Sequence, residues 1–518
     1  MFFERLLKPR VKFKPSRKSS SPEFESIPIT ECLEENLQRL AGVIGQPLDL
    51  VIHRIEGENS IAAALVYLRS LVDGPLLGSQ IVEPINNYLR NGAERIDHKT
   101  IRNLFSASDI IESNELNAAV NMLLSGKVLA LFSGTAIAFS LSFPGFPRRP
   151  IEDALNEKVM KGPREGFSES LQDNLSLVRR WIKDPNLQVE AKTIGRRTQT
   201  ELAILYLKDV AKPSIVQEVH KRLEQVDIDG IIDSGYISEL ITDNKYTYFP
   251  LVQETERPDK VVAGILEGRV AILVDKSSFN IIVPVTSTEY YQIREDFTFN
   301  YWTGSFLRFI RAFGTVISVA LPGFYLATVS VNPELLPPIL VQLIASSRVQ
   351  VPFPLVVETL LAMLIFEIFR ESTLRMPGNV SNILGISGGV LLGQAALSIS
   401  IVAPATVVVV VITSLATFTT ADSTKEQAWR ITRYFLFAAA AAFGIYGLSL
   451  AGFVVLTHMA NLKSFGVSYL APWGPPIVLD MLDAYIRLPW WASYRRPATY
   501  RPQDEDRLDI DEEGGDKG

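Results

Sequence analysis

The chain has 518 residues, a formal net charge of −6 at pH 7 and a mean hydropathy of +0.16. This length allows two or three domains, and the negative net charge argues against a nucleic-acid-binding protein, which would need a basic surface. The mean hydropathy averages two unlike halves, because residues 1–300 are rich in charge whereas residues 305–457 are mostly apolar. We therefore expect a soluble region followed by a membrane region.

Charge collects at the two ends of the chain. The first 18 residues carry seven lysines and arginines, and residues 503–518 are mainly acidic. No apolar core of about 7–15 residues follows the basic stretch, so it is not a secretory signal peptide. Two interpretations of the basic stretch stay open, an anchor on anionic lipid headgroups and a solvated tail. The acidic, glycine-containing end is predicted to be disordered.

Cysteine and histidine are too sparse to suggest a redox, metal or catalytic centre. Cys32 is the only cysteine, which rules out an internal disulfide and fits a reducing compartment for the soluble half. The four histidines are scattered along the sequence, at His53, His98, His220 and His458. No other residues form a recognisable catalytic set, so we expect no enzyme activity, no bound metal and no cofactor.

The soluble half contains a weak internal repeat. Residues 64–68, Ala-Leu-Val-Tyr-Leu, match residues 203–207, Ala-Ile-Leu-Tyr-Leu. Residues 124–131 match residues 266–273 at nearly the same offset along the chain. Two matches in the same order and at nearly one offset predict a duplicated subdomain.

Each copy is expected to run strand, helix, helix, strand, which is an α/β arrangement. In the second copy, the short apolar runs at 203–207 and 270–274 predict strands, and the apolar spacing at 214–226 predicts a helix. A further short helix is expected at 258–266. Two such lobes either enclose a ligand-binding cleft or simply pack against each other or a neighbouring subunit, and the second alternative is slightly favoured.

A glycine-containing loop, Lys161-Gly-Pro-Arg-Glu-Gly-Phe167, lies between the two copies. Its residues Gly162, Arg164 and Gly166 are candidates for holding an anion ahead of the predicted helix 169–182. The alternative is a structural turn that leads into the helix, which the pattern favours. The loop is not a nucleotide-binding Walker motif, so nothing in it supports nucleotide hydrolysis.

Four stretches in the second half are long and apolar enough to cross a bilayer, for which about 20 residues are needed. They are residues 309–329, 383–400, 402–420 and 434–456. Arg308 and Arg311 begin the first stretch, so the positive-inside rule places that end and the soluble half in the cytoplasm. The predicted fold class is an α/β soluble region of two similar subdomains followed by an all-α multi-pass membrane domain.

Residues 355–369 are ambiguous, because 15 apolar residues suit an interfacial or re-entrant helix better than a full span. Glu358 and Glu367 are nine positions apart and point in roughly opposite directions on a helix. At least one of these membrane acids should therefore meet water, protein or a cation, which makes both functional candidates. The alternative is an interfacial helix with hydrated carboxylates.

The same stretch determines the predicted topology. If residues 355–369 span the membrane, the basic residues between 370 and 433 lie inside, as the charge rule prefers, and the C-terminal tail lies outside. If they do not span, the tail lies inside and those basic residues lie outside. The short length of residues 355–369 favours the second topology, whereas the charge rule favours the first.

The predicted helix 383–400 has two distinct faces. Small residues form a ridge that would let another helix approach closely, and we predict helix packing there: Ser381, Gly385, Gly389, Gly393 and Ala396. The opposite face is partly polar, and we hypothesise that it lines an ion pore: Ser387, Leu391, Gln394 and Ser398. The alternatives are serines that bond their own backbone and a glutamine that joins two helices.

Several motifs occur together in one order along residues 30–475. Beside the Lys161–Phe167 loop they are Glu256-Arg-Pro-Asp-Lys-Val261, Glu267-Gly-Arg-Val-Ala-Ile-Leu-Val-Asp275, Val283-Pro-Val-Thr286, Val351-Pro-Phe-Pro354, Leu384-Gly-Ile-Ser-Gly-Gly-Val-Leu-Leu-Gly-Gln-Ala-Ala396 and Ser464-Phe-Gly-Val-Ser-Tyr-Leu-Ala-Pro472. In this combination the chain resembles the A subunits of the GerA-type spore germinant receptors of endospore-forming bacteria.

The resemblance implies a multi-pass protein of the spore inner membrane with a cytoplasmic N-terminal region. It implies a permease-like B subunit that binds the nutrient and a lipoprotein C subunit as partners, contact with membrane lipid, and no nucleic acid. It also implies a homo-oligomer that acts as a nutrient-gated cation channel in germination. One departure is Asn332, which precedes Pro333-Glu334-Leu335 where a histidine is expected.

Together these patterns predict five regions: a basic tail at 1–28, a first cytoplasmic α/β subdomain at 29–150, a second at 151–300, a helical transmembrane domain at 301–460 and a C-terminal tail at 461–518. The rival hypothesis is a ligand-binding or scaffolding subunit, with ion release elsewhere in the receptor. A secondary transporter is a weaker third option, because no inverted repeat is detected in the membrane half.

Overall fold

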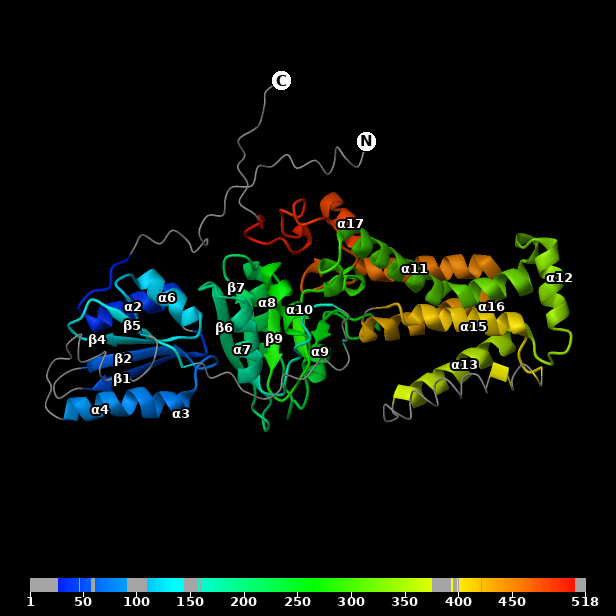
Figure 1. Cartoon of the computed structure of the whole chain (residues 1–518). Helices are drawn as coiled ribbons and strands as arrows, with labels where there is room; N and C mark the ends of the chain where they lie inside the picture. The colour runs from blue at the N-terminus through cyan, green and yellow to red at the C-terminus, as the bar shows by residue number, and fades with distance from the viewer. Residues whose placement is uncertain are drawn as a thin grey trace, which may run out of the picture.

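The computed structural model describes residues 27–45, 47–56, 61–90, 110–143, 157, 161–374, 393, 394, 398, 400–420 and 422–507. A first sheet, a second sheet and a layer of long helices follow one another along the molecule (Figure 1). The predicted basic tail and the last acidic residues, 508–518, lie outside the described residues, apart from Ile27 and Pro28.

The first sheet has five antiparallel strands with helices on both faces (Figure 1). Its order is β1(Leu50–Glu56), β2(Ile61–Leu68), β4(Val128–Phe132), β5(Ala138–Leu141) and β3(Ile110–Ser113). One face packs on α2(Leu33–Ile44) and α6(Leu116–Leu124). The other packs on α3(Gly74–Leu77), the π-helical turn η1(Gly78–Val82) and α4(Glu83–Arg90). Because both faces are covered, the central strands are continuous apolar runs.

The second sheet repeats this order with β6(Leu187–Ile194), β7(Thr200–Leu207), β9(Val270–Val274), β10(Asn280–Val283) and β8(Gln253–Thr255). One face packs on α7(Leu171–Trp181) and α10(Pro258–Leu266), and the other on α8(Pro213–Glu224) and α9(Ser234–Ile241). The matching sequence pairs fall on equivalent central strands, β2 with β7 and β4 with β9. The strands missing from the predicted pattern lie on either side of these central strands.

The two sheets are joined by a buried ion pair. The Arg179 guanidinium on α7 donates from Nη2 and Nε to the two carboxylate oxygens of Asp49, at 3.0 and 3.2 Å. The Ser70 hydroxyl donates to the same carboxylate at 2.7 Å, and the Leu48 amide donates to the Val189 carbonyl at 3.0 Å. These contacts support the alternative in which the lobes pack directly on each other.

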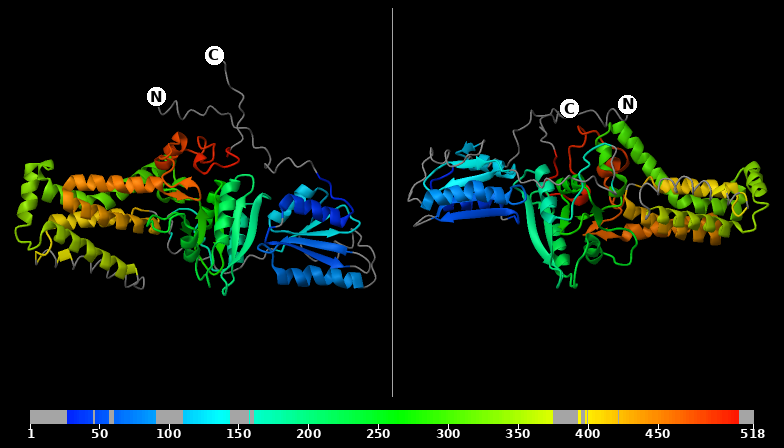
Figure 2. Two further views of the ribbon diagram at one scale, coloured as in Figure 1. Left: turned by 180° about the vertical axis from the view of Figure 1, so that it is seen from behind. Right: turned by 60° about the horizontal axis from the view of Figure 1, so that its bottom comes forward.

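The helical layer begins with α11(Tyr301–Leu326), which continues into the π-helical turn η4(Ala327–Val331). After the 3₁₀ turn η5(Pro333–Leu335) come α12(Pro338–Ser347), α13(Leu355–Leu374), α15(Pro404–Thr417) and α16(Ser423–Asn461). Figures 1 and 2 show the long helices side by side, with α12 across the end remote from the sheets.

Helix α13 is longer than predicted, and the expectation that it ends at residue 369 is wrong. It has 20 residues instead of 15. The charged Arg370 does not terminate it, because its guanidinium forms an ion pair with Glu426 of α16. The helix runs from the remote end, where Glu358 bonds the amide of Ala403, back to this pair near the sheets.

Helix α16 reverses direction at Gly444, so the prediction of one straight span at 434–456 is wrong. Gly444 has φ 60° and ψ −140°, a conformation that only glycine adopts readily. The rings of Trp429 and His458 lie 5.5 and 6.1 Å from the ring of Phe249, although a straight helix would separate these two residues by about 43 Å. The arms 423–443 and 445–461 therefore form a hairpin, which an apolar sequence run does not reveal.

Asn332 sits at the tip of this hairpin. Its Oδ1 accepts the amide hydrogen of Ile445 at 3.1 Å, and its Nδ2 donates to Glu334 at 3.1 Å. The side chain thereby caps the arm that starts after the reversal, which is a structural role for the residue found where histidine is expected.

The second arm returns the chain to the second sheet. There β11(Lys463–Ser464), β12(Val467–Ser468), α17(Val478–Tyr485) and the 3₁₀ turn η6(Ala498–Tyr500) form a folded C-terminal segment. The Val285 amide donates to Ser464 Oγ at 3.0 Å, and the Ser287 amide donates to the Tyr469 carbonyl at 2.7 Å. The C-terminal segment and the soluble half therefore lie at the same end of the helical layer.

Candidate functional site

The predicted pore and packing helix lies mostly outside the described residues. Of the packing ridge, Ser381, Gly385, Gly389 and Ala396 are not described, and of the polar stripe Ser387 and Leu391 are not. The described Gln394 and Ser398 are exposed. A Cβ atom built on Gly393 meets no described atom within 4 Å. The ridge and the pore stripe therefore stay predictions.

Glu358 is buried at the start of α13 and holds two groups. Its Oε2 accepts from Arg348 Nε at 3.1 Å, and its Oε1 accepts from the Ala403 amide at 2.8 Å. Ala403 immediately precedes α15, so the carboxylate satisfies a free amide at the positive end of that helix. Glu358 thus ties three segments together at the remote end of the helical layer.

Glu367 lies at the other end of α13 between two arginines of α16. Its carboxylate is 2.7 Å from Arg430 Nη2 and 3.8 Å from Arg433 Nη1. Arg433 also donates to the Ser318 carbonyl of α11 at 2.6 Å and to the Thr417 hydroxyl of α15 at 2.5 Å. Water, protein or a cation was predicted to meet at least one of these acids. Both glutamates pair with arginine side chains of the protein, which balance their negative charge.

The N-terminus of α7, where the sequence suggested an anion site, is occupied by side chains of the protein itself. The hydroxyl of Ser170 accepts from the Asp173 amide at 3.4 Å, and the Asp275 carboxylate accepts from the Leu171 amide at 3.4 Å. Both groups occupy the helix N-terminus that an external anion would need. Gly162, Arg164 and Gly166 stay candidates only by sequence, and these bonds support the structural alternative.

The start of α11 is fixed to the second sheet by a buried acid. The Asp296 carboxylate accepts from Arg308 Nε at 3.0 Å and forms a second ion pair with Arg311. Arg311 Nε also donates to the Tyr291 carbonyl at 3.0 Å. The two arginines used to predict the topology are therefore buried and paired.

The start of α16 is fixed by Lys425 to the loop 287–296, which follows the second sheet and also contains Asp296. Its ammonium donates to the Ser287 carbonyl and to the Ser287 hydroxyl, the latter at 2.9 Å. Three aromatic rings surround it, those of Tyr291 at 4.2 Å, Tyr290 at 4.9 Å and Trp429 at 5.8 Å. Cation–π attraction offsets part of the cost of burying this ammonium. Both α11 and α16 thus begin with cations held by the loop 287–296.

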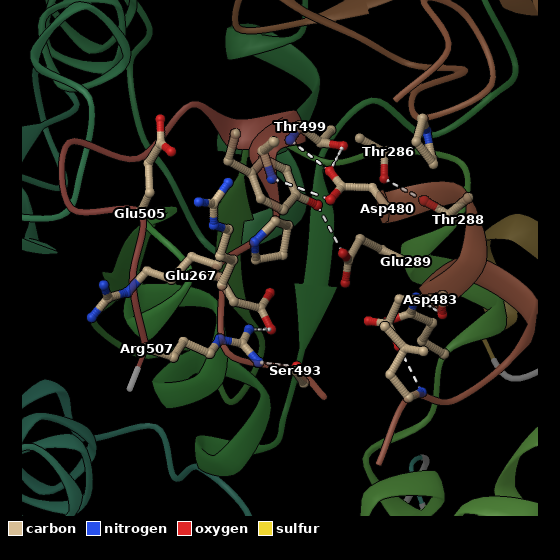
Figure 3. A pocket seen from close by; sticks show the side chains of 18 of the residues that line it. Glu267, Thr286, Thr288, Glu289, Asp480, Asp483, Ser493, Thr499, Glu505 and Arg507 are labelled. Carbon is tan, nitrogen blue, oxygen red and sulfur yellow. Dashed lines mark hydrogen bonds and ion pairs between the residues drawn. The ribbon is translucent and has the colours of Figure 1, made fainter. Parts of the chain in front are cut away.

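A cavity of about 130 Å³ lies beside this loop, between the second sheet and the C-terminal segment. The Glu289 carboxylate accepts from the Tyr500 hydroxyl at 2.8 Å, and the Asp480 carboxylate accepts from the Thr499 amide at 2.8 Å (Figure 3). Arg507 donates to Glu267 at 3.3 Å on another wall. These charged and hydroxyl side chains line the cavity together with apolar surface.

The two glutamates of the cavity have opposite electrostatic surroundings. Burial raises the pKa of Glu267, against the nearby Arg294 and Arg507, and the Glu289 carboxylate adds to the rise. Burial alone would also raise the pKa of Glu289, but Arg269, Arg294 and the Tyr500 hydroxyl outweigh it, so that pKa is lowered. The surroundings therefore favour the ionised form at Glu289 more than at Glu267.

Sequence analysis did not predict the junction, the name used here for the loop 287–296 together with the side chains of α11, α16 and the C-terminal segment that contact it. One residue of the quoted motifs could have indicated it. Arg269, from the quoted motif 267–275, is buried and donates to the Pro284 carbonyl at 2.8 Å and to Gln253 at 2.7 Å. A buried arginine inside an apolar strand motif could have indicated a polar junction. Within the part of the chain that is described, no group of three or more histidine, cysteine or acidic side chains is arranged to hold a metal ion.

Comparison with known proteins gives consistent matches. The profile of the family described as "Bacillus/Clostridium GerA spore germination protein" matches residues 38–499. Spore germination protein KA of Bacillus subtilis (strain 168) is 34% identical over 496 residues, covering 93% of this chain and 89% of that protein. The uncharacterized membrane protein YfkQ of the same organism is 31% identical over 475 residues, covering 91% and 92%.

One solved structure is also similar. It is the crystal structure of the N-terminal domain of the A subunit of the Bacillus megaterium spore germinant receptor GerK3, which is 32% identical. The match covers 50% of this chain and 97% of that domain, with a TM-score of 0.40.

Proposed function

The chain belongs to the Bacillus/Clostridium GerA family of spore germination proteins, and from this premise we propose that it is the A subunit of a nutrient-sensing germinant receptor. In this proposal it oligomerises in the spore inner membrane into a nutrient-gated cation channel. Its partners are a permease-like B subunit and a lipoprotein C subunit. Its relatives are named spore germination proteins, which supports the role in germination, and the channel, the oligomer and the two partner subunits are what the family resemblance implies.

Membrane insertion is supported by the surface of the helical layer. Tyr301–Val331 has the length and composition of a membrane-crossing helix, and the two arms of Ser423–Asn461 are similarly apolar. Large apolar side chains project from them, including Phe309, Phe313 and Phe453, which are all more than half exposed. So extensive an apolar surface is unfavourable in water and favourable in lipid.

An even number of crossings is supported by the return of the chain to the second sheet. The C-terminal segment hydrogen-bonds the loop after β10, so both must occupy one side of the membrane. The proposal meets this condition with six crossings: α11, α13, the predicted helix 383–400, the two arms of α16, and α15, which with its 14 residues is shorter than a full span. Arg370, Lys425 and Arg430 then lie at the cytoplasmic end, as the positive-inside rule prefers, and the 20 residues of α13 are enough for a crossing.

The observation that carries the gating proposal is the shared anchorage of two helices. The loop 287–296 of the second sheet holds the first turns of α11, through Asp296 and Arg308, and of α16, through Ser287 and Lys425. A movement of the second subdomain would therefore displace both helices together. To shift the channel from 1% to 99% open, the nutrient-bound partner must favour the open state by about 5.5 kcal/mol.

The proposed conduction path follows the polar stripe Ser387, Leu391, Gln394 and Ser398, with Leu391 as a gate that excludes water. The exposure of Gln394 and Ser398 in the single chain is compatible with a pore formed between subunits. The proposed contact between subunits is the ridge around Gly385, Gly389 and Gly393, because small residues allow close helix approach.

Ion flux through liposomes containing the full chain tests the channel. Leu391→Ala should widen and hydrate the gate and produce a cation leak that is absent from empty liposomes. Leu415→Ala is the matched control, since it makes the same change at an exposed position of α15. A leak that appears in neither variant, with oligomers intact, would reject the Leu391 gate.

The alternative function is a ligand-binding or scaffolding subunit, with ion release elsewhere in the complex. The cavity beside Glu289 and Asp480 is the observation that favours it. This alternative predicts that Glu289→Gln abolishes the germination response while the receptor still assembles, and that no variant of this chain conducts ions in liposomes.

A further inference from the structure

We propose that residues 478–491, here called the interfacial segment, lie against the lipid headgroups of the membrane leaflet nearest the sheets. This inference rests on the proposed crossing of the membrane by α11. It assigns the lipid surface as a partner to a part of the chain outside the long apolar helices.

The amphipathic character of α17 is reversed from that of a helix on a water-soluble protein. Val478 is 71% exposed, and Leu482 and Ile486, each four residues further on, are 38% and 40% exposed. The acidic side chains turn inward instead. Asp480 accepts from the Thr499 amide, and Asp483 lies 3.6 Å from the buried Arg308. Apolar side chains outside and carboxylates inside indicate that the medium outside is not water.

Tryptophans continue the exposed apolar surface beyond α17. Trp490 is 56% exposed and Trp491 follows it at 36%. Tryptophan combines a large apolar ring with one hydrogen-bond donor and is enriched at the interface between membrane and water. This residue type therefore favours the headgroup layer over the hydrocarbon interior as the medium of the segment.

The interfacial segment is attached to the first turns of α11. The Arg487 amide donates to the Ser305 hydroxyl at 3.0 Å, and the Arg487 guanidinium donates to the Phe299 carbonyl at 3.1 Å. The ring of Trp490 packs on Phe297 at 5.6 Å between centroids. Trp302 and Phe306, close to Ser305 on α11, are also exposed, so both segments present apolar side chains near this contact. Figures 1 and 2 show α17 beside the sheet-proximal end of α11.

The length of α11 places this end in the headgroup layer. Tyr301–Val331 has 31 residues, which rise about 46 Å at 1.5 Å per residue. A bilayer is about 40–45 Å thick including its headgroups, and about 30 Å of that is hydrocarbon. When the apolar part of the helix fills the hydrocarbon, its first turns reach the headgroups. The segment bound to these turns lies at the same level.

Spin labels on the full chain in liposomes of phosphatidylglycerol and phosphatidylethanolamine test the inference. The background is Cys32→Ser, and single cysteines replace Leu482 and Ile486. Glu505→Cys is the water-facing control, because the neighbouring Gln503 is bonded to Val210 and Ala211 beside the second sheet. Val316→Cys, on the exposed face of α11, reports the membrane crossing itself.

We expect the ratio of oxygen collisions to nickel-chelate collisions to be severalfold higher for labels at Leu482 and Ile486 than for the label at Glu505. The same ratio should place these two labels at a shallower depth in the membrane than the label at Val316. Nickel accessibility equal to that of Glu505, with Val316 still in lipid, would overturn the interfacial segment alone. Labels at Leu482 and Ile486 that collide with neither oxygen nor the nickel chelate would also overturn the inference, because protein would then cover the exposed face of α17. A nickel-accessible Val316 would instead reject the crossing of α11.

Discussion

The Glu358 carboxylate satisfies the free amide of Ala403 and the charge of Arg348 at once. Glu358→Leu should destabilise the chain by about 1–3 kcal/mol, because the buried amide before α15 loses its acceptor. Glu358→Gln keeps an oxygen acceptor at that place and should lose less. Thermal unfolding of the detergent-solubilised protein measures both. Equal losses in the two variants would show that the charge pair, and not the amide bond, is what matters.

Glu289 makes stability depend on acid in a defined direction. Its pKa is lowered in the folded chain by Arg269, Arg294 and Tyr500, against the effect of burial. Its contribution is therefore complete above the unfolded pKa of about 4.3 and is lost as the pH falls through the lower folded pKa. Glu289→Gln should be less stable than the wild type at pH 7 and lose less stability on acidification.

Unfolding temperatures measured from pH 7 downward check this prediction. Glu505→Gln is the control, since it removes an exposed carboxylate from the rim of the same cavity. It should follow the wild-type curve throughout. An acid-induced loss in Glu289→Gln as large as that of the wild type would assign the acid sensitivity to other groups.

Elements with a local signal were the predictable ones. The apolar runs of β7 and β9 and the spacing of α8 and α10 are visible in sequence because both sheet faces are covered by helices. The edge strand β6 was missed, since half-buried polar residues such as Glu190 and Lys192 interrupt its apolar run. The proximity of the two ends of α16 was not predicted. Both ends contact Phe249, which is far from them in the sequence, so no local pattern indicates the contact.

The hairpin of α16 leads to a test at the level of the element. Gly444→Ala forces a side chain into a backbone conformation that costs about 1–3 kcal/mol, and its Cβ would lie 2.7 Å from Val331 Cγ1. Gly452→Ala, on the returning arm, meets no atom within 4 Å and should be neutral or slightly stabilising. Thermal unfolding compares the two. If both glycines tolerate alanine equally, the chain does not reverse at Gly444.

The junction shows why the site was harder to predict than the fold. Lys425 and Tyr500 are distant in sequence and belong to no motif with a recognised chemistry, yet both contact the loop 287–296, at Ser287 and Glu289. Glu358 and Glu367 were found because acids in an apolar stretch are unusual. Their arginine partners could not be assigned, since pairing depends on how α13 packs against α15 and α16.

At the scale of the whole molecule, the return of the chain to the second sheet predicts which residues share one side of the membrane. Cys32 is exposed on the soluble half and reports that side in the wild-type chain. In a Cys32→Ser background, Glu505→Cys should behave identically and react with a membrane-impermeant maleimide only after protoplasts are permeabilised. Val349→Cys, 81% exposed beside α12 at the remote end, should react in intact protoplasts.

Labelling of Glu505→Cys in intact protoplasts, with Cys32 protected, would require an odd number of crossings. That result is incompatible with the hydrogen bonds between Ser464 and Val285 and between Tyr469 and Ser287, because no chain can form them across a bilayer.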